Sequence, residues 1–304
     1  MQAGESQALF TAMGCPCEVR LFATDNDLSQ QVLRQCHGEA LRFQNKYSRY
    51  REDSIVSKIN HSAGQSPVTI DPETSAIMQY SSVCYVQSNG LFDITSGVLR
   101  QIWNMDTQTL PRQSEIDNCL ETIGWDKVEL ETDSIFLPDP GMELDLGGVV
   151  KEYASDAIAE KARQAGIESG YVNLGGDIAI IGPQPDKRPW PVGISDPDHT
   201  DKPVATIQLS KGAVSTSGGY ERYTSIDGKR YSHMINPKTG WPVDSLLSVS
   251  VAAPKAVVAG SLTSIALLQG SDTGVEFLKN CGVAFFAIDQ SGAYHGHLEK
   301  ITND

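Results

Sequence analysis

Two glycine pairs on either side of one amphipathic helical segment constrain this sequence more than any other feature. The first pair, Gly147-Gly148, follows a short apolar stretch that contains Asp145, and a helical pattern begins directly afterwards. The second pair, Gly175-Gly176, interrupts an apolar segment over 171–181, which predicts a strand with a bulge. Between the pairs, apolar residues recur at helical spacing, so one helix face should be buried. These residues are Val149, Val150, Tyr153, Ala154, Ala157, Ile158 and Ala162.

The first glycine pair has the features of an anion site at a strand-to-helix turn. Glycines there let a ligand approach the backbone closely, and the unpaired N–H groups of the first helical turn favour an anion such as phosphate. Asp145 would repel a phosphate unless a cation or a ligand N–H lay between them. The turn therefore indicates a nucleotide site with a metal or a polar ring edge nearby, although the same pattern occurs where a helix only packs closely on a sheet.

The charge of the chain narrows the classes of partner. Its 304 residues include 24 Lys and Arg against 38 Asp and Glu, a formal net charge of −14. Nucleic acids and anionic membranes require a basic surface, so we expect neither as the main target. No stretch approaches the about 20 apolar residues that span a bilayer, and residues 1–10 lack the pattern of a secretion signal. These features favour a cytoplasmic protein, or a periplasmic one if a leader has been removed.

Six cysteines are scattered along the chain and do not resemble a disulfide framework. Cys15 and Cys17 have one residue between them, too few for the usual zinc pair, and no second pair exists. We expect buried or idle thiols.

Periodicity predicts helices and strands that alternate irregularly. Helices are expected over 28–47 with Asp27 as cap, over a short segment ending near Asn60, over 71–88 with Asp71 or Thr74 as cap and Asn89-Gly90 as stop, within 107–132, and over 256–269. Strands are expected over 13–22, 192–194, 204–209, 214–220, 230–235, 248–252 and 285–288, the last forming a hairpin through residues 290–292. This order predicts the α+β class, with mixed or antiparallel sheets and packed helices, rather than a doubly wound parallel sheet.

His233 is the clearest candidate for acid–base chemistry. It lies near the end of a predicted strand, before a rigid turn at Asn236-Pro237 and Thr239-Gly240. A histidine on a fixed support suits proton transfer, because its unperturbed pKa lies near neutrality. A strand-end histidine that only bonds a turn carbonyl would give the same pattern.

Other candidates carry weaker signals. Asp93 fits either a site or a loop cap, and Tyr50 lies in a polar loop where it could stack on a ligand. The segment 215–220 is either a backbone nest for an anion or a glycine-rich hairpin corner. A nucleophilic role for Ser217 lacks the Gly-x-Ser-x-Gly elbow, and neither glycine pair has the Gly-x-Gly-x-x-Gly spacing of a dinucleotide fold.

Taken in order, seven segments resemble the ApbE family, the FAD:protein FMN transferases, over nearly the whole chain. They are Met13-Gly14; Ser48-Arg49-Tyr50; Gly90-Leu91-Phe92-Asp93-Ile94-Thr95; Asp145-Leu146-Gly147-Gly148 with Lys151; Asn173-Leu174-Gly175-Gly176-Asp177; Ser215-Thr216-Ser217-Gly218-Gly219-Tyr220 with Arg222; and His233-Met234-Ile235-Asn236-Pro237-Lys238-Thr239-Gly240. Each segment is weak alone, and their shared order makes the resemblance specific.

The resemblance implies one α+β domain over 1–304, T-fold-like, that binds FAD in a cleft. Family members use Mg²⁺ to split the FAD pyrophosphate, release AMP and attach FMN to a Ser or Thr of a partner flavoprotein; some hydrolyse FAD to FMN and AMP instead. By this resemblance His233 is the acid–base residue, and the Gly148 carbonyl and Ser264 face the metal. The residues implied to line the FAD are Met13, Tyr50, Leu91, Phe92, Asp93, Asp145, Lys151 and Ile235.

Two positions depart from the family pattern. Gly260 stands where the late helix of the family carries a metal-binding Asp, and Ser264 stands where it carries a Thr. Cys15 follows Met13-Gly14 where the family has a Thr. Losing a carboxylate ligand should weaken the binding of Mg²⁺, because this ion prefers hard oxygen ligands. Substrate phosphates together with Asp145 or Asp177 would have to compensate for the loss.

Two functions therefore compete. The first is an active Mg²⁺-dependent flavin transferase. The second is a flavin-binding member with weakened or lost catalysis, which holds FAD or hydrolyses it slowly and which Gly260→Asp would restore. A plain interaction domain is disfavoured, because it leaves both glycine pairs, Asp145 and His233 without a shared reason.

Overall fold

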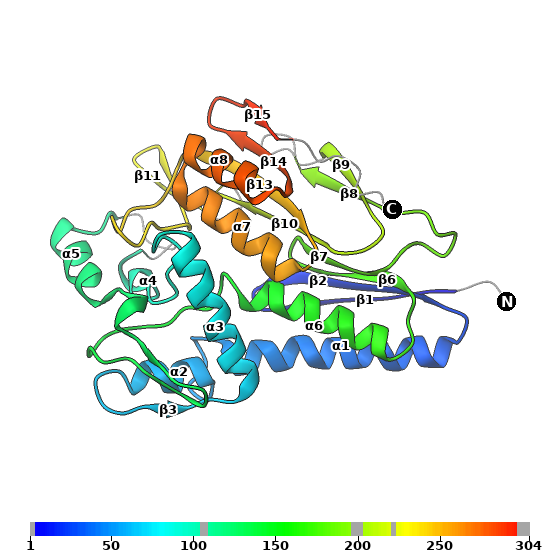
Figure 1. The fold of residues 1–304 in the computed structure, drawn as a ribbon, viewed down its shortest axis with the longest axis horizontal. Helices are drawn as coiled ribbons and strands as arrows, with labels where there is room; N and C mark the ends of the chain where they lie inside the picture. The colour runs from blue at the N-terminus through cyan, green and yellow to red at the C-terminus, as the bar shows by residue number, and fades with distance from the viewer. Residues whose placement is uncertain (1–3, 104–108, 196–202, 220–222, 297–304) are drawn as a thin grey trace.

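An antiparallel sheet of eight strands organises the computed structural model, which describes residues 4–103, 109–195, 203–219 and 223–296 (Figure 1). In spatial order its strands are β1 (Gly4–Ala12), β2 (Cys15–Ala23), β6 (Ser169–Leu174), β7 (Asp177–Gly182), β10 (Ala213–Gly218), β13 (Leu246–Ala253), β14 (Ala284–Asp289) and β15 (Tyr294–His295). Within the described residues, each strand pairs antiparallel with its neighbours. The predicted α+β class with antiparallel sheets is confirmed.

Helices cover one face of this sheet and a hairpin covers the other. The covering helices are α1 (Asn26–Tyr47), α6 (Val150–Gln164), α7 (Ala256–Gln269) and α8 (Ser271–Cys281) (Figure 1). The hairpin consists of β8 (Trp190–Ser195) and β9 (Pro203–Leu209). Strand alternation explains the division, because Val251 of β13 packs toward α7 while its neighbour Ala252 packs toward Trp190 and Ile207 of the hairpin.

The remaining elements gather beside the sheet. They are α2 (Ile55–His61), α3 (Pro72–Gln87), α4 (Leu99–Ile102), α5 (Gln113–Thr122), the 3₁₀ turn η1 (Trp125–Lys127), β3 (Val68–Thr69), β4 (Glu129–Leu130), β5 (Ser134–Phe136), β11 (Tyr223–Ile226) and β12 (Lys229–Ser232). None of the described helices is long and apolar enough to cross a membrane.

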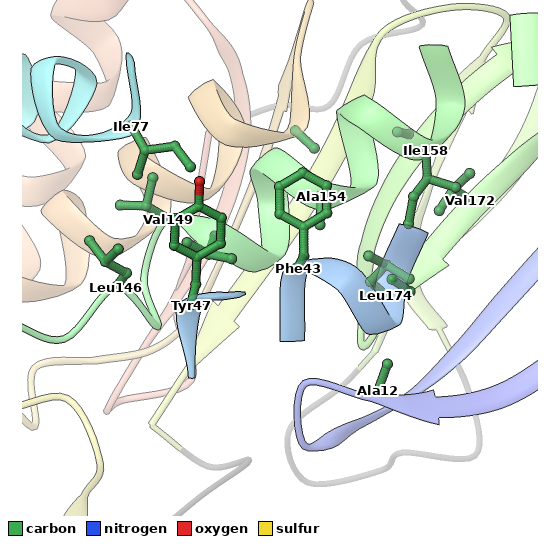
Figure 2. Packing of buried hydrophobic residues seen from close by; sticks show 14 of the residues in the cluster. Ala12, Phe43, Tyr47, Ile77, Leu146, Val149, Ala154, Ile158, Val172 and Leu174 are labelled. Carbon is green, nitrogen blue, oxygen red and sulfur yellow. The ribbon is translucent and has the colours of Figure 1, made fainter. Parts of the chain in front are cut away.

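The buried face of α6 forms the centre of the largest hydrophobic cluster. Figure 2 shows Ala154 and Ile158 of α6 packed between Phe43 of α1 and Val172 of β6. The face predicted from helical spacing is confirmed, with two of its residues only half-buried. The half-buried residues are Tyr153 and Ala157, and the buried ones are Val149, Val150, Ala154, Ile158 and Ala162.

The second glycine pair is a hairpin turn, so the prediction of one bulged strand over 171–181 was wrong. β6 ends at Leu174, β7 begins at Asp177, and these two residues pair across the turn. Gly175 and Gly176 have φ values of +62° and +96°. A two-residue turn with positive φ at both positions strongly favours glycine. A glycine pair between two apolar segments therefore fits a hairpin turn as well as a bulged strand.

Other differences concern the ends of elements. Asp25, not Asp27, caps α1, because its carboxylate accepts the N–H groups of Asp27 and Leu28. No regular strand precedes Gly147-Gly148; Glu143 makes only an isolated parallel bridge to Ser96. β12 ends at Ser232, shorter than the predicted strand over 230–235. β1 and α8 were not predicted, since β1 alternates weakly along a sheet edge and only Gly270 separates α8 from α7.

Most other expectations are confirmed. Asp71 caps α3 through the N–H of Thr74, and Asn89 and Gly90 turn the chain away with φ values of +54° and +79°. The helices expected near Asn60 and over 256–269, and the strands over 192–194, 204–209, 248–252 and 285–288, are present. The strand expected over 13–22 begins at Cys15, and the strand expected over 214–220 ends at Gly218, with Tyr220 outside the described residues. Within 107–132 the helix is α5, and residues 107 and 108 lie outside the described residues. All six cysteines are free, and all but Cys281 are buried.

Asp156 of α6 fixes the start of α7. Its Oδ1 and Oδ2 accept the N–H groups of Ala256 and Val257 at 2.9 and 3.0 Å. These groups belong to the first turn of α7, where no partner exists within the helix. The carboxylate therefore caps a helix that is far away in sequence and holds α7 antiparallel to α6.

Replacing Asp156 by Ala is expected to lower the free energy of unfolding by about 1–2 kcal/mol, because two part-buried N–H groups lose their acceptor. Urea unfolding followed by circular dichroism measures the change. Asp156→Asn keeps one carbonyl acceptor and should lose less; an alanine variant as stable as the wild type would show that the cap contributes nothing.

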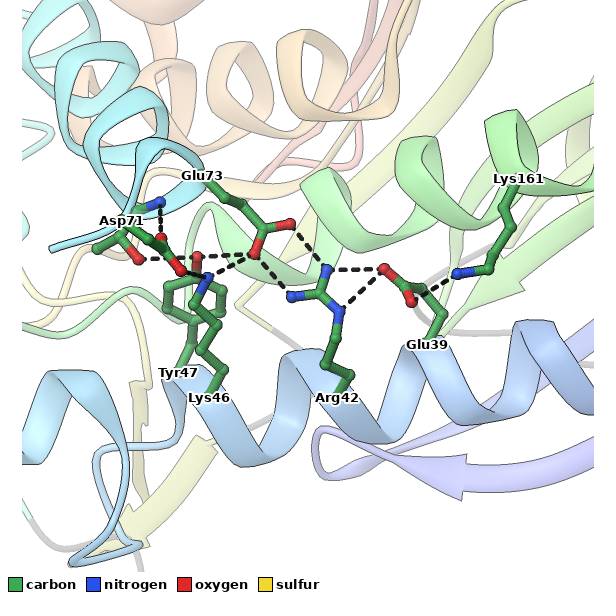
Figure 3. Close-up of polar contacts among 8 residues, drawn as sticks. Glu39, Arg42, Lys46, Tyr47, Asp71, Glu73 and Lys161 are labelled. Atoms are coloured by element: carbon green, nitrogen blue, oxygen red, sulfur yellow. Dashed lines mark hydrogen bonds and ion pairs between the residues drawn. The ribbon is translucent and has the colours of Figure 1, made fainter. Parts of the chain in front are cut away.

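An ion-pair network joins α1, α3 and α6 on the surface of the helical layer (Figure 3). Arg42 forms a bidentate pair with Glu73, with both N–O distances 2.7 Å, and also bonds Glu39. Lys161 of α6 reaches Glu39 at 3.0 Å, and Lys46 contacts both Asp71 and Glu73. Burial alone would raise the pKa of Glu73, but hydrogen bonds from Arg42 and Lys46 lower it to about 2.

This network makes stability dependent on pH in the acid range. The folded pKa of Glu73 lies below its ordinary value of 4.5, so its contribution is complete above pH 4.5 and is lost as pH falls through about 2. After solvent screening we expect a loss of about 1–2 kcal/mol. Urea midpoints measured from pH 6 to pH 2 test this, and Glu73→Gln should flatten the profile; an equal slope in both proteins would contradict it.

Candidate functional site

The carboxylate of Asp145 lies between two arginines at the first glycine pair. Its Oδ2 is 3.3 Å from Nη1 of Arg49 and 3.7 Å from Nε of Arg100, while Oδ1 accepts the N–H of Gly147 at 2.9 Å. Arg49 also pairs with Glu143, so charge is balanced across the turn. Two arginine side chains of this chain therefore supply positive charge beside Asp145.

Arg100 joins this turn to His233. Its Nη1 donates to the carbonyl oxygen of His233 at 2.7 Å, while its Nε faces Asp145. Two residues predicted independently, Asp145 and His233, are therefore brought together by one side chain. Sequence reasoning missed Arg100, which lies in no recognisable pattern; Arg49 lies within the Ser48-Arg49-Tyr50 segment but was not singled out.

Two hydrogen bonds support the loop that follows His233. Asn236 Oδ1 accepts the N–H of Lys238 at 2.8 Å, which closes the turn. The indole of Trp103 donates to the Gly240 carbonyl at 2.7 Å and anchors the far end. Ile235, predicted to line the flavin, is half-buried against the cluster around Trp103. His233 itself is half-buried directly after β12, which suits a group that must reach a ligand.

The loop after α3 places Phe92 against the first glycine pair. The Phe92 ring lies 3.6 Å from the position that a Cβ on Gly148 would occupy. Asp93 accepts hydrogen bonds from the N–H and hydroxyl of Thr95 and from the N–H of Trp125. Burial raises the pKa of Asp93. These bonds make Asp93 the organiser of the loop, and Leu91 is half-buried beside it.

Met13 and Tyr50, both predicted to line the flavin, lie in different surroundings. Met13 has a φ of +50° in the β1–β2 turn, and its N–H donates to Gln44 Oε1 at 2.7 Å. Tyr50 is 85% exposed, with the Arg49 guanidinium 5.9 Å from its ring centre. Because the Tyr50 ring is largely exposed, it is accessible for stacking on a planar ligand.

The second glycine pair adjoins Lys151. A Cβ on Gly175 would lie 2.7 Å from Cys15 Cβ and 3.8 Å from Lys151 Nζ, so only glycine fits there. Lys151 Nζ pairs with the buried Asp177 at 2.7 Å. Burial would lower the pKa of Lys151, but Asp177 holds it above its usual value. The Lys151 ammonium therefore lies beside the second glycine pair as one half of an ion pair with Asp177.

Gly260 is covered by the side chain of Glu152. A Cβ on Gly260 would lie 2.5 Å from Glu152 Cγ and 3.0 Å from Oε1. Glu152 is 5% exposed, and its Oε2 has no hydrogen-bond partner among the described residues. Burial and the neighbouring Asp177 raise the pKa of Glu152. Ser264, the predicted metal ligand, is buried one helical turn further along α7. Sequence reasoning missed Glu152.

The described residues contain no group of three His, Cys, Asp or Glu side chains placed to hold a metal. A metal here would therefore depend on one carboxylate, main-chain and hydroxyl oxygens, and phosphate oxygens of a ligand, which is a common set for Mg²⁺. The unpartnered oxygen of Glu152 fits that need. Tyr220 and Arg222, part of the segment after β10, lie outside the described residues.

Comparison with known proteins decides the family. The model of the ApbE family matches residues 13–287. The chain belongs to the ApbE family. The FAD:protein FMN transferase of Klebsiella pneumoniae (strain 342) is 29% identical over 273 residues, with 88% of this chain and 83% of the relative covered. The FAD:protein FMN transferase of Salmonella typhimurium is 31% identical over 255 residues, covering 81% and 73%.

Solved structures agree with this family assignment. The ApbE protein of Thermotoga maritima superposes with a TM-score of 0.90 at 29% identity, with 97% of each chain covered. The flavin transferase ApbE of Vibrio cholerae gives 0.87 at 23% identity over 97% of each chain, a likeness that shows the fold. The order of segments in the sequence thus identified the ApbE family correctly.

Proposed function

We propose that this ApbE chain is an FAD:protein FMN transferase, which splits FAD and attaches FMN to a Ser or Thr of a partner flavoprotein. The observation that carries the proposal is the Arg100 bridge, which places the His233 backbone beside the Asp145 turn. The two relatives named as FAD:protein FMN transferases support the same activity.

In this proposal the acceptor hydroxyl oxygen attacks the phosphorus of the FMN half of FAD. The bond from that phosphorus to the bridging oxygen breaks, and AMP leaves with the bridging oxygen. His233 takes the hydroxyl proton as general base. Lys151 and Arg100 supply positive charge near the diphosphate, and Tyr50 offers an exposed ring for stacking. The other residues assigned to the flavin are Met13, Leu91, Phe92, Asp93, Asp145 and Ile235.

The family implies Mg²⁺, and the donors present fit it in part. The Gly148 carbonyl and the Ser264 hydroxyl would hold it, together with phosphate oxygens. When bound, the ion would draw negative charge from the diphosphate and the leaving AMP. Gly260 contributes no side chain, so a carboxylate must come from elsewhere.

Gly260 also favours a second candidate, a member that binds FAD and has lost most catalysis. Such a protein would hold or deliver flavin, or hydrolyse FAD slowly. The two candidates differ in turnover, because both bind FAD but only the transferase releases AMP as the acceptor becomes labelled.

Incubating the purified protein with FAD, a Ser/Thr acceptor protein and increasing Mg²⁺ tests the proposal. We expect AMP, measured by chromatography, in step with flavin fluorescence on the acceptor, and neither product in EDTA. AMP without labelling would show hydrolysis. No AMP above background at any metal concentration would reject the transferase and leave the flavin-holding candidate.

A further inference from the structure

We propose that Glu152 supplies, from α6, the carboxylate of a divalent-cation site at Gly260, so that this chain has relocated a metal ligand and not lost it. This inference rests on the proposed function only for the purpose of the cation, which would serve the FAD diphosphate. Binding of the cation can be measured separately.

The packing of α6 on α7 places Glu152 at Gly260. The helices run antiparallel, with Asp156 capping residues 256 and 257. One turn back along α6 is Glu152, and one turn on along α7 is Gly260. The Glu152 Cγ lies 2.5 Å from where a Cβ of residue 260 would be. The carboxylate on α6 thus fills the space that a side chain at 260 would occupy.

Ser264 lies on the same face of α7 as this carboxylate. Residues four apart on a helix are neighbours, so a carboxylate over residue 260 adjoins the side chain at 264. Ser264 and Glu152 retain 7% and 5% exposure. The two provide hard oxygen atoms at one location, which favours Mg²⁺ or Mn²⁺ over softer metals.

The local charges leave room for one cation. Glu152 and Asp177 are two buried carboxylates, and Lys151 is the ammonium beside them. Lys151 pairs with Asp177 at 2.7 Å, while Glu152 Oε2 has no partner among the described residues. Ionising a buried carboxyl group that has no partner is strongly unfavourable, and a bound divalent cation would compensate that charge.

Mn²⁺ titration of flavin-free protein, with free Mn²⁺ quantified by electron paramagnetic resonance, tests the site. Glu152→Gln keeps the shape and removes the charge, and we expect the dissociation constant for Mn²⁺ to rise at least about tenfold. Glu160→Gln, two turns further along the same helix, where Glu160 bonds Arg163 and Gln164, is the matched control and should bind Mn²⁺ as the wild type does. Unchanged Mn²⁺ affinity in a folded Glu152→Gln variant would overturn the proposal.

A double variant tests the site even if the Glu152→Gln variant does not fold. Glu152→Ala with Gly260→Asp moves the carboxylate back to α7 and should bind Mn²⁺ more tightly than Glu152→Ala alone; no gain would count against the site. The proposed function fails independently, if wild-type protein binds Mn²⁺ through Glu152 yet releases no AMP from FAD. The inference alone fails if the wild type releases AMP while the Mn²⁺ affinity is the same in the wild type and in Glu152→Gln.

Discussion

Replacing His233 by Ala is expected to slow FMN transfer by about 10²–10⁴-fold, the usual contribution of a positioned general base. The substitution removes the group proposed to take the acceptor proton, whereas the Arg100 bond to the backbone carbonyl of residue 233 can persist. Acceptor labelling and AMP release should therefore fall together, while FAD binding, measured by fluorescence quenching, changes little.

The control is His61→Ala, at the exposed end of α2 and outside the site. It should transfer FMN at the wild-type rate. If His233→Ala retained more than about a tenth of the wild-type rate, below the effect of general-base catalysis, another group would have to accept the proton.

Gly260→Asp is expected to reduce stability and not to restore activity in an otherwise wild-type chain. A Cβ at this position would come within 2.5 Å of Glu152 Cγ, so the new carboxylate and the old one would compete for one space. Overpacking of this kind lowers the free energy of unfolding by about 1–3 kcal/mol. Urea unfolding and AMP release from FAD measure the two effects.

Gly38→Ala is the matched control for the glycine change. It also lies within a helix, but a Cβ there meets nothing within 4 Å. Removing a helical glycine at an open position should stabilise the protein by about 0.4–1 kcal/mol. If Gly260→Asp raised both stability and turnover, Glu152 would not occupy the site as described. That result would support the hypothesis that the wild type holds flavin with little catalysis.

The features that depend on local periodicity were predicted correctly from the sequence. The apolar face of α6 and the caps and stops of α3 follow from spacing and turn chemistry, as Ala154 and Asp71 show. The order of short segments also identified the ApbE family. These properties depend on residues near one another in the chain.

Features that depend on distant contacts were not predictable. The Gly175-Gly176 turn and a bulge look alike in sequence, and only the pairing of Leu174 with Asp177 distinguishes them. Arg100 acquires its role from contacts to residues 145 and 233, far along the chain. Glu152 follows Lys151 in a helix and reads as a solvated charge, because nothing local reveals that α7 covers it.

The contact between Glu152 and Gly260 has an evolutionary consequence. An acid at both positions overfills the space between α6 and α7, whereas a small residue at both leaves a hollow without a carboxylate. Substitutions at the two positions should therefore show strong epistasis, with either exchange harmful until the other occurs. A lineage that carries the acid on α6 is then separated by an unfit intermediate from one that carries it on α7.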